Sequence, residues 1–144
     1  MTASRRYLVV FGIAVFVAGF TAGNLWQADT SVQAQSSGKV FELRTYTTPE
    51  GKLPNLVARF RDHTRRIFEK HGISNVGYWV PQDSPNTLVY IIAHDSRDAA
   101  TDSWKQFGAD PEWQEVSETS QVDGRIVSSV VSVFMEPTDF SAIK

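Results

Sequence analysis

The most constraining feature of the sequence is the stretch Ile73–His94, in which two apolar runs flank a short polar segment. The runs, Ile73–Val80 and Thr87–His94, are rich in aromatic and β-branched residues, which fit the half-buried surface of a β-sheet. The segment between them, Pro81–Asn86, consists of residue types that favour turns. The sequence therefore predicts a β-hairpin with a long loop, and we expect this hairpin at the centre of the sheet.

Two further stretches have the character of strands. Val40–Thr48 alternates between its two faces and is rich in β-formers. Arg125–Glu136 is strongly β-branched and is apolar on both faces. The chain therefore has one predicted strand before the hairpin and one predicted strand near its C-terminus.

Three stretches are predicted to be helical. Leu53–His71 carries an apolar stripe at three- and four-residue spacings, and Gly72 follows where a left-handed helix cap would lie. Arg97–Phe107 has a narrower apolar stripe. A short helix from Pro111 to about Ser120 is expected to be capped by Asp110.

The order of elements is strand, helix, strand, strand, helix, strand, which is the split βαβ arrangement of a ferredoxin-like α+β domain. Right-handed crossovers place the helices on one face of a four-stranded antiparallel sheet. The other face should show polar residues if it met water, yet the strands are largely apolar on both faces. We therefore expect a second copy to cover it in a two-fold homodimer.

Residues 1–34 have the composition of an export signal. Arg5 and Arg6 precede the apolar run Tyr7–Phe20, and small residues follow up to Ala34. These are the parts of a cleaved secretory signal, and the paired arginines also fit the twin-arginine type. We expect a periplasmic or extracellular protein with residues 35–39 as a leader. The alternative is an uncleaved segment that anchors the chain to the membrane.

Composition excludes several classes of function. A formal net charge of −2 gives no electrostatic basis for binding nucleic acid. The absence of cysteine excludes disulfides, thiolate metal sites and cysteine nucleophiles. Phosphate-binding glycine loops, esterase elbows and paired metal carboxylates are also absent from the sequence, so neither a metal site nor a cofactor is predicted.

Five short motifs carry a resemblance to the NIPSNAP family. They occur in the family's order over about residues 39–137, and are Val40–Tyr46, Glu69–Ile73, Gly77–Trp79, Leu88–Tyr90 and Asp110–Trp113. The resemblance implies a dimeric α+β barrel, with the domain at 40–137 and a tail at 138–144. It implies no defined activity. Animal members are associated with mitochondria and with trafficking or mitophagy signalling, a role that the export signal argues against here.

The candidate site residues each allow two interpretations. Arg44 and Tyr46 share a predicted strand face with Glu42, and either bind an anion or carbonyl group or form an ordinary ion pair with packing. His63 and His71 lie roughly 12 Å apart on one predicted helix, too far for one metal ion. They and His94 are acid/base or haem-ligand candidates, or simply packed histidines.

The aromatic residues Trp79, Tyr90, Trp104 and Trp113 either line a pocket or fill the core, and Trp79 and Trp113 are the preferred pocket residues. The resulting hypothesis is an exported dimer that binds a small hydrophobic or carbonyl-containing ligand. A cofactor-independent or haem-dependent monooxygenase-like enzyme and a protein-interaction module at the outer membrane face are the alternatives. Whether the protein is an enzyme stays open.

Overall fold

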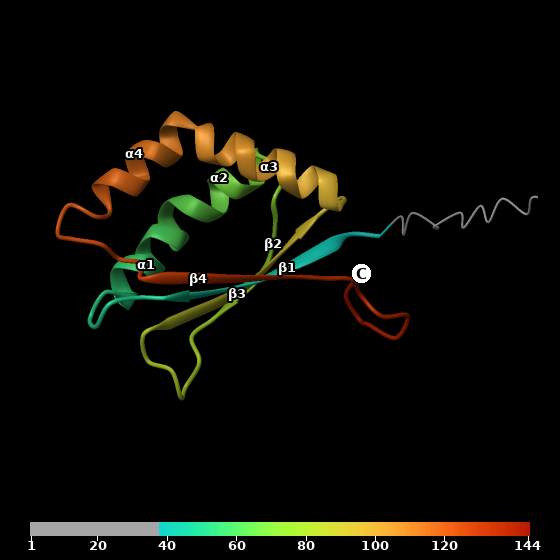
Figure 1. Ribbon diagram of the computed structural model, residues 1–144, viewed down its shortest axis with the longest axis horizontal. Helices are drawn as coiled ribbons and strands as arrows, with labels where there is room; N and C mark the ends of the chain where they lie inside the picture. Colours follow the sequence, from blue (N-terminus) through green and yellow to red (C-terminus); the bar gives the residue numbers. More distant parts are fainter. Residues whose placement is uncertain (1–37) are drawn as a thin grey trace, which may run out of the picture. The chain divides into compact units, whose positions relative to one another are not determined.

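The computed structural model describes residues 38–144, in which four antiparallel strands form one sheet with the helices on one face (Figure 1). The predicted signal at residues 1–34, and most of the leader, lie outside the described residues. The strands are β1 (Val40–Thr47), β2 (Ser74–Trp79), β3 (Thr87–His94) and β4 (Ser129–Met135). This is the predicted ferredoxin-like α+β fold.

The strand order is β2-β3-β1-β4, so the hairpin is not the centre of the sheet. Its second strand, β3, is central and pairs with β1, whereas β2 forms one edge. The expectation that the hairpin would form the centre of the sheet was therefore wrong for β2, and β1 is the second central strand. The two strands of a hairpin are always neighbours in the sheet. Which of them also pairs with a third strand depends on the helical connections between the other strands, and the hairpin sequence does not reveal this.

The first helical region is continuous but not regular. It comprises α1 (Leu53–Arg59), a π-helical turn η1 (Phe60–Thr64) and α2 (Arg65–Lys70), where one α-helix was predicted. Apolar spacing is the same before and after the π turn, which is why the sequence pattern did not reveal it. The region ends at Lys70, and Gly72 follows in the predicted cap position, where its φ of 73° is the left-handed conformation that glycine adopts without strain.

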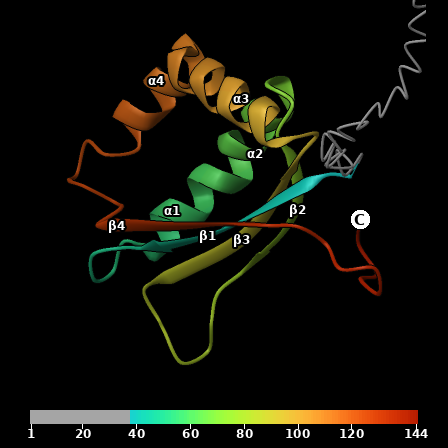
Figure 2. The ribbon, with the colours of Figure 1, turned by 45° about the vertical axis from the view of Figure 1, so that its right-hand side comes forward.

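The second helical region comprises α3 (Arg97–Ala109) and α4 (Pro111–Thr119). The Ser96 side chain caps α3 by accepting a hydrogen bond from the Ala99 amide at 3.0 Å. The Asp110 carboxylate caps α4 through the Glu112 amide at 2.9 Å, as predicted. Figures 1 and 2 show both helical regions on the same side of the sheet.

The core lies between these helices and the sheet. Its aromatic centre is Phe60, Phe68 and Tyr90, whose ring centroids lie 5.0–6.2 Å apart. Ile126 is also buried in this core but precedes β4, so the predicted last strand, Arg125–Glu136, began too early. The β-branched run Arg125–Glu136 therefore includes both β4 and the connection that precedes it.

The opposite face of the sheet is apolar and open in this chain. Val131 and Val133 of β4 are 58% and 48% exposed, and Trp79 of β2 is 52% exposed. The helices also leave β4 uncovered on their own side, where Val130 is 42% exposed. The sequence predicted that the helices cover the whole of one face of the sheet. In the structure they cover mainly β1, β2 and β3.

Within residues 38–144, no helix is long and apolar enough to cross a membrane. The same residues contain no group of three histidine or carboxylate side chains placed to hold a metal ion.

Candidate functional site

Glu42 lies at the centre of a buried polar network on the helix-facing side of the sheet. Its Oε1 accepts hydrogen bonds from Arg44 Nη1 and Ser132 Oγ, each at 2.6 Å. Its Oε2 accepts one from Trp104 Nε1 at 2.8 Å and lies 3.1 Å from His94 Nε2. The network thus ties β1 to β3, β4 and α3.

These donors hold Glu42 in its ionised form. Burial alone would raise the pKa of the carboxyl group, but hydrogen bonds from His94, Ser132, Trp104 and Arg44 lower it to about 2. The residue is 1% exposed, so its charge depends on these partners rather than on water.

Arg44 connects the network to two tyrosines. Its Nη2 donates to the Tyr46 hydroxyl at 3.3 Å, and its guanidinium lies 4.3 Å from the centre of the Trp104 ring. Tyr90 is its direct cross-strand partner on β3. Burial opposes the charge of Arg44, but its hydrogen bonds to Glu42 and Tyr46 help to raise its pKa above the ordinary value.

Three buried polar atoms of this region have no hydrogen-bond partner among residues 38–144. They are Arg44 Nε, the Tyr90 hydroxyl and His94 Nδ1. Burial raises the pKa of Tyr90, so its hydroxyl is a neutral donor. Buried polar groups in folded proteins are almost always paired, so these three atoms are exceptions to the rule.

The network borders solvent on the β4 side. Val130 and Ser132, which face the helices, are exposed, and the Arg44 side chain is 16% exposed. Of the ion-paired side chains in the network, that of Arg44 is therefore the nearest to solvent.

The structure brings together five of the nine candidate residues, namely Arg44, Tyr46, Tyr90, His94 and Trp104. Trp79 does not join them, because its side chain lies on the opposite face of the sheet, against Gly77. His63 and Trp113 lie on η1 and α4.

Sequence reasoning missed Ser132 and treated Glu42 only as a partner of Arg44. The signal was present in Glu42, Arg44 and Tyr46, which alternate along one strand and so share one face. Ser132 gives no such signal, because only pairing of β4 with β1 brings it opposite Arg44.

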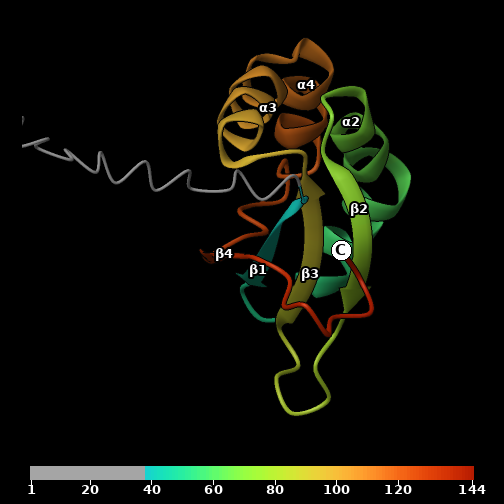
Figure 3. The same ribbon diagram turned by 90° about the vertical axis from the view of Figure 1, so that its right-hand side faces the viewer.

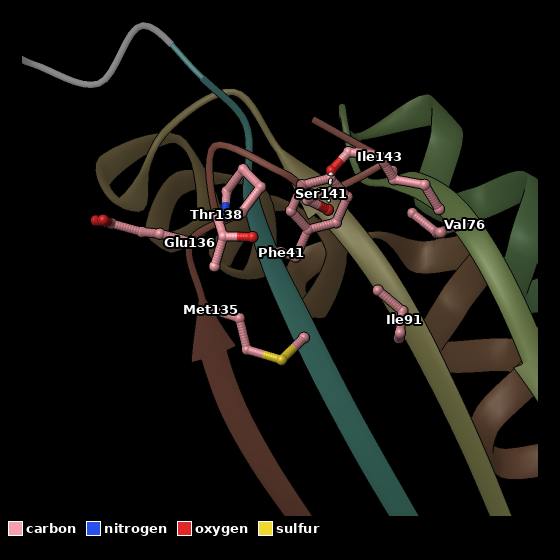
Figure 4. A pocket seen from close by; sticks show the side chains of 9 residues that line it. Phe41, Val76, Ile91, Met135, Glu136, Thr138, Ser141 and Ile143 are labelled. Atoms are coloured by element: carbon pink, nitrogen blue, oxygen red, sulfur yellow. Dashed lines mark hydrogen bonds between the residues drawn. The ribbon is translucent and has the colours of Figure 1, made fainter.

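An apolar pocket of about 310 Å³ lies on the other face of the sheet. The segment after β4 folds back toward β3 and β2 (Figure 3) and closes one side of this pocket. Figure 4 shows Phe41, Val76 and Ile91 of the sheet facing Ile143 of the tail. The predicted tail at 138–144 therefore contributes to a cavity.

Comparison with known proteins decides the family. The NIPSNAP family model matches residues 41–142, which is most of the chain. This chain belongs to the NIPSNAP family. The match extends beyond residue 137, where the sequence motifs had placed the end of the domain, and takes in most of the tail.

Solved NIPSNAP structures have the same fold. A NIPSNAP family protein of unknown function from Agrobacterium tumefaciens is 25% identical, with a TM-score of 0.67 over 76% of this chain and 96% of that one. A second from the same organism is 21% identical, with a TM-score of 0.66 over 74% and 100% of the two chains. A search of functionally curated proteins finds no match to this chain.

The fold also resembles that of a protein from Chloroflexus aurantiacus assigned provisionally to the antibiotic biosynthesis monooxygenases. The two are 14% identical, with a TM-score of 0.51 over 74% of this NIPSNAP chain and 100% of the other. This likeness concerns the fold alone, so a monooxygenase-like activity stays a prediction.

Proposed function

We propose that this NIPSNAP protein is an exported homodimer that binds a small carbonyl- or carboxylate-containing ligand against Arg44. The observation that supports this most directly is the pairing of Arg44 with Tyr90 across β1 and β3, with Nε and the hydroxyl both unpartnered among residues 38–144. Directly opposed side chains on one sheet face lie close enough to act on one group.

The chemistry of these two donors favours an oxygen acceptor. Guanidinium and phenol groups both donate, and Arg44 Nε has no alternative role as an acceptor. A carbonyl or carboxylate oxygen would accept from both, while Tyr46 and Trp104 supply aromatic walls beside the guanidinium. Glu42 would hold Arg44 in place rather than contact the ligand.

The proposed dimer rests on the apolar open face and on β4. Three apolar side chains of this face are about half exposed in a single chain, namely Val131, Val133 and Trp79. Exposed apolar patches of this kind often mark surfaces that bind another protein. A second copy packed against the open face would cover them. A partner that also reached around the β4 edge would cover Val130 and narrow the approach to Arg44.

Export rests on the sequence of residues 1–34 alone. N-terminal sequencing of the mature protein tests it. A mature start after Ala34 is expected, whereas a start at Met1 in membrane fractions would contradict cleavage.

The ligand is tested first by mass spectrometry of small molecules that co-purify with native protein, together with a visible absorption scan. The first variant is Tyr90→Phe, which removes only the unpartnered hydroxyl. Its control is Tyr78→Phe, which makes the same change within the domain at a hydroxyl that donates to Asn75. We expect the co-purified ligand to be reduced in Tyr90→Phe only. A colourless protein without bound molecules would remove both this proposal and the haem alternative.

Stability provides the second readout. Tyr90→Phe should leave the domain as stable as the wild type or more so, because a buried hydroxyl without a partner contributes nothing to folding. A clear loss of stability would instead assign the hydroxyl a structural role and argue against the proposal. Residues 35–144 suffice for this measurement, because the solved relatives are matched over at least 96% of their own chains.

A further inference from the structure

Arg59 is a second buried arginine, and its charge has no protein counter-ion among the described residues. It is the last residue of α1 and is 6% exposed. Nη1 reaches only the Ser120 hydroxyl, at 3.4 Å, and Nε has no hydrogen-bond partner in this part of the chain. None of the ion pairs among residues 38–144 includes Arg59, whereas Arg44 is paired with Glu42.

A guanidinium group in this position is energetically unfavourable. Arginine keeps its proton in proteins, so Arg59 cannot become neutral to escape burial. Its guanidinium lies 5.1 Å from the centre of the Trp113 ring, which offers a cation–π contact but no negative charge. Buried charges in stable proteins are paired or hydrogen-bonded, so this site lacks an anion.

Arg59 lines a pocket of about 490 Å³ between the first helical region and α4. This volume is within the range of small-molecule sites. The pocket has a polar rim, because Asp62, His63 and Glu115 are exposed while Arg59 is buried. Its lining does not overlap the Glu42 network, so it is a separate site.

The local backbone is unusual at the same position. The π-helical turn η1 begins directly after Arg59, and the Thr64 hydroxyl donates to the Arg59 carbonyl oxygen at 3.2 Å. The neighbouring Phe60 is also buried. π-Helical turns inside α-helices occur frequently at functional sites, which agrees with the location of this pocket.

We propose that this pocket binds a small zwitterion, with its carboxylate on Arg59 and its cationic group between Asp62 and Glu115. The two carboxylates at the rim determine this choice. A dianion would leave its second charge facing Asp62 and Glu115, and a simple amine would leave Arg59 without an anion. A molecule of amino-acid size with opposite charges at its ends provides an anion for Arg59 and a cation for the two carboxylates.

Calorimetric titration of residues 35–144 tests the proposal with four probes of matched length. They are δ-aminovalerate, which carries both charges, and valerate, pentylamine and glutarate, which do not. We expect δ-aminovalerate to bind at least about tenfold more tightly than each of the others, a difference that titration readily resolves. Equal binding of valerate, or no binding of any probe, would overturn the proposal.

Variants assign the binding to the pocket. Arg59→Met keeps most of the side chain and should abolish binding of δ-aminovalerate without lowering the melting temperature, because an unpaired buried charge is removed. Arg61→Met is the control, since Arg61 is exposed and does not line this pocket. Asp62→Asn combined with Glu115→Gln should remove the preference over glutarate.

The two proposed sites can fail independently. Tyr90→Phe should leave δ-aminovalerate binding unchanged, because Tyr90 does not line the Arg59 pocket. Binding that persists in Arg59→Met but is lost in Tyr90→Phe would overturn the inference and assign the probe to the Arg44 site instead.

Discussion

Replacement of Glu42 by glutamine tests the central electrostatic argument of this fold. The substitution preserves the size of the side chain but replaces one acceptor oxygen with an NH₂ group. Oε1 accepts from Arg44 and Oε2 from Trp104, and both of these groups can only donate. Whichever way the amide is oriented, its NH₂ group must therefore face a donor.

The expected loss of unfolding free energy follows from the charge of Arg44, which the substitution leaves without its partner. The variant loses the negative charge opposite Arg44 in a site where Glu42 is 1% exposed. Removal of one partner from a buried ion pair typically costs about 3–5 kcal/mol of unfolding free energy. For an m-value of about 1.5 kcal/mol per molar urea, this lowers the unfolding midpoint by about 2–3 M.

Acid should reduce the difference between wild type and variant. The pKa of Glu42 is lowered from 4.5 to about 2 in the folded protein, so its contribution is complete above pH 4.5 and is lost as the pH falls toward 2. The difference should shrink by about 1.4 kcal/mol per pH unit within this window.

Urea unfolding of residues 35–144 at pH 7 and at pH 4 and below, followed by circular dichroism, measures both effects. Glu118→Gln is the matched control, because Glu118 is exposed on α4. A loss of less than about 1 kcal/mol at pH 7, or a difference that does not change in acid, would refute the account of Glu42 as a charge held by its donors.

Three further changes test other parts of the fold. Gly72→Ala should destabilise the domain by about 1–2 kcal/mol in urea unfolding, because φ at this position is 73°; an unchanged midpoint would contradict this. Ser96→Ala should cost about 1 kcal/mol through loss of the α3 cap, and Ser96→Thr should restore most of it. Val131→Glu should convert the proposed dimer to a folded monomer in sedimentation, since Val131 is 58% exposed in one chain. A wild-type protein that sediments as a monomer would remove the dimer proposal itself.

Local patterns were sufficient for most elements of the fold. The Leu53–His71 stripe gave the correct helical region, and β3 was predicted with its exact ends. Caps at Asp110 and Gly72 were also readable, because a cap depends on residues only a few positions apart. The π turn after Arg59 was not, since it leaves the apolar spacing on either side unchanged.

The candidate site was predictable only in part. Glu42, Arg44 and Tyr46 share a strand face by simple alternation, so their contact was implied by their positions in the chain. Tyr90 and Ser132 reach Arg44 only because β1 pairs with β3 on one side and with β4 on the other. The burial of Arg59 without a carboxylate was also not predictable, because it depends on contacts with Trp113 and Ser120, which lie far along the chain.

The sequence by itself determined the α+β class, the strand and helix order and the apolar character of both faces of the sheet, because these depend on local periodicity and composition. Only the tertiary structure decided that β1 and β3 are central, that β4 is left uncovered on both faces, and which charges are paired. The physical reason is that burial and charge pairing depend on contacts between residues far apart in the chain, such as Glu42 with Ser132, and no local pattern encodes which of these contacts form.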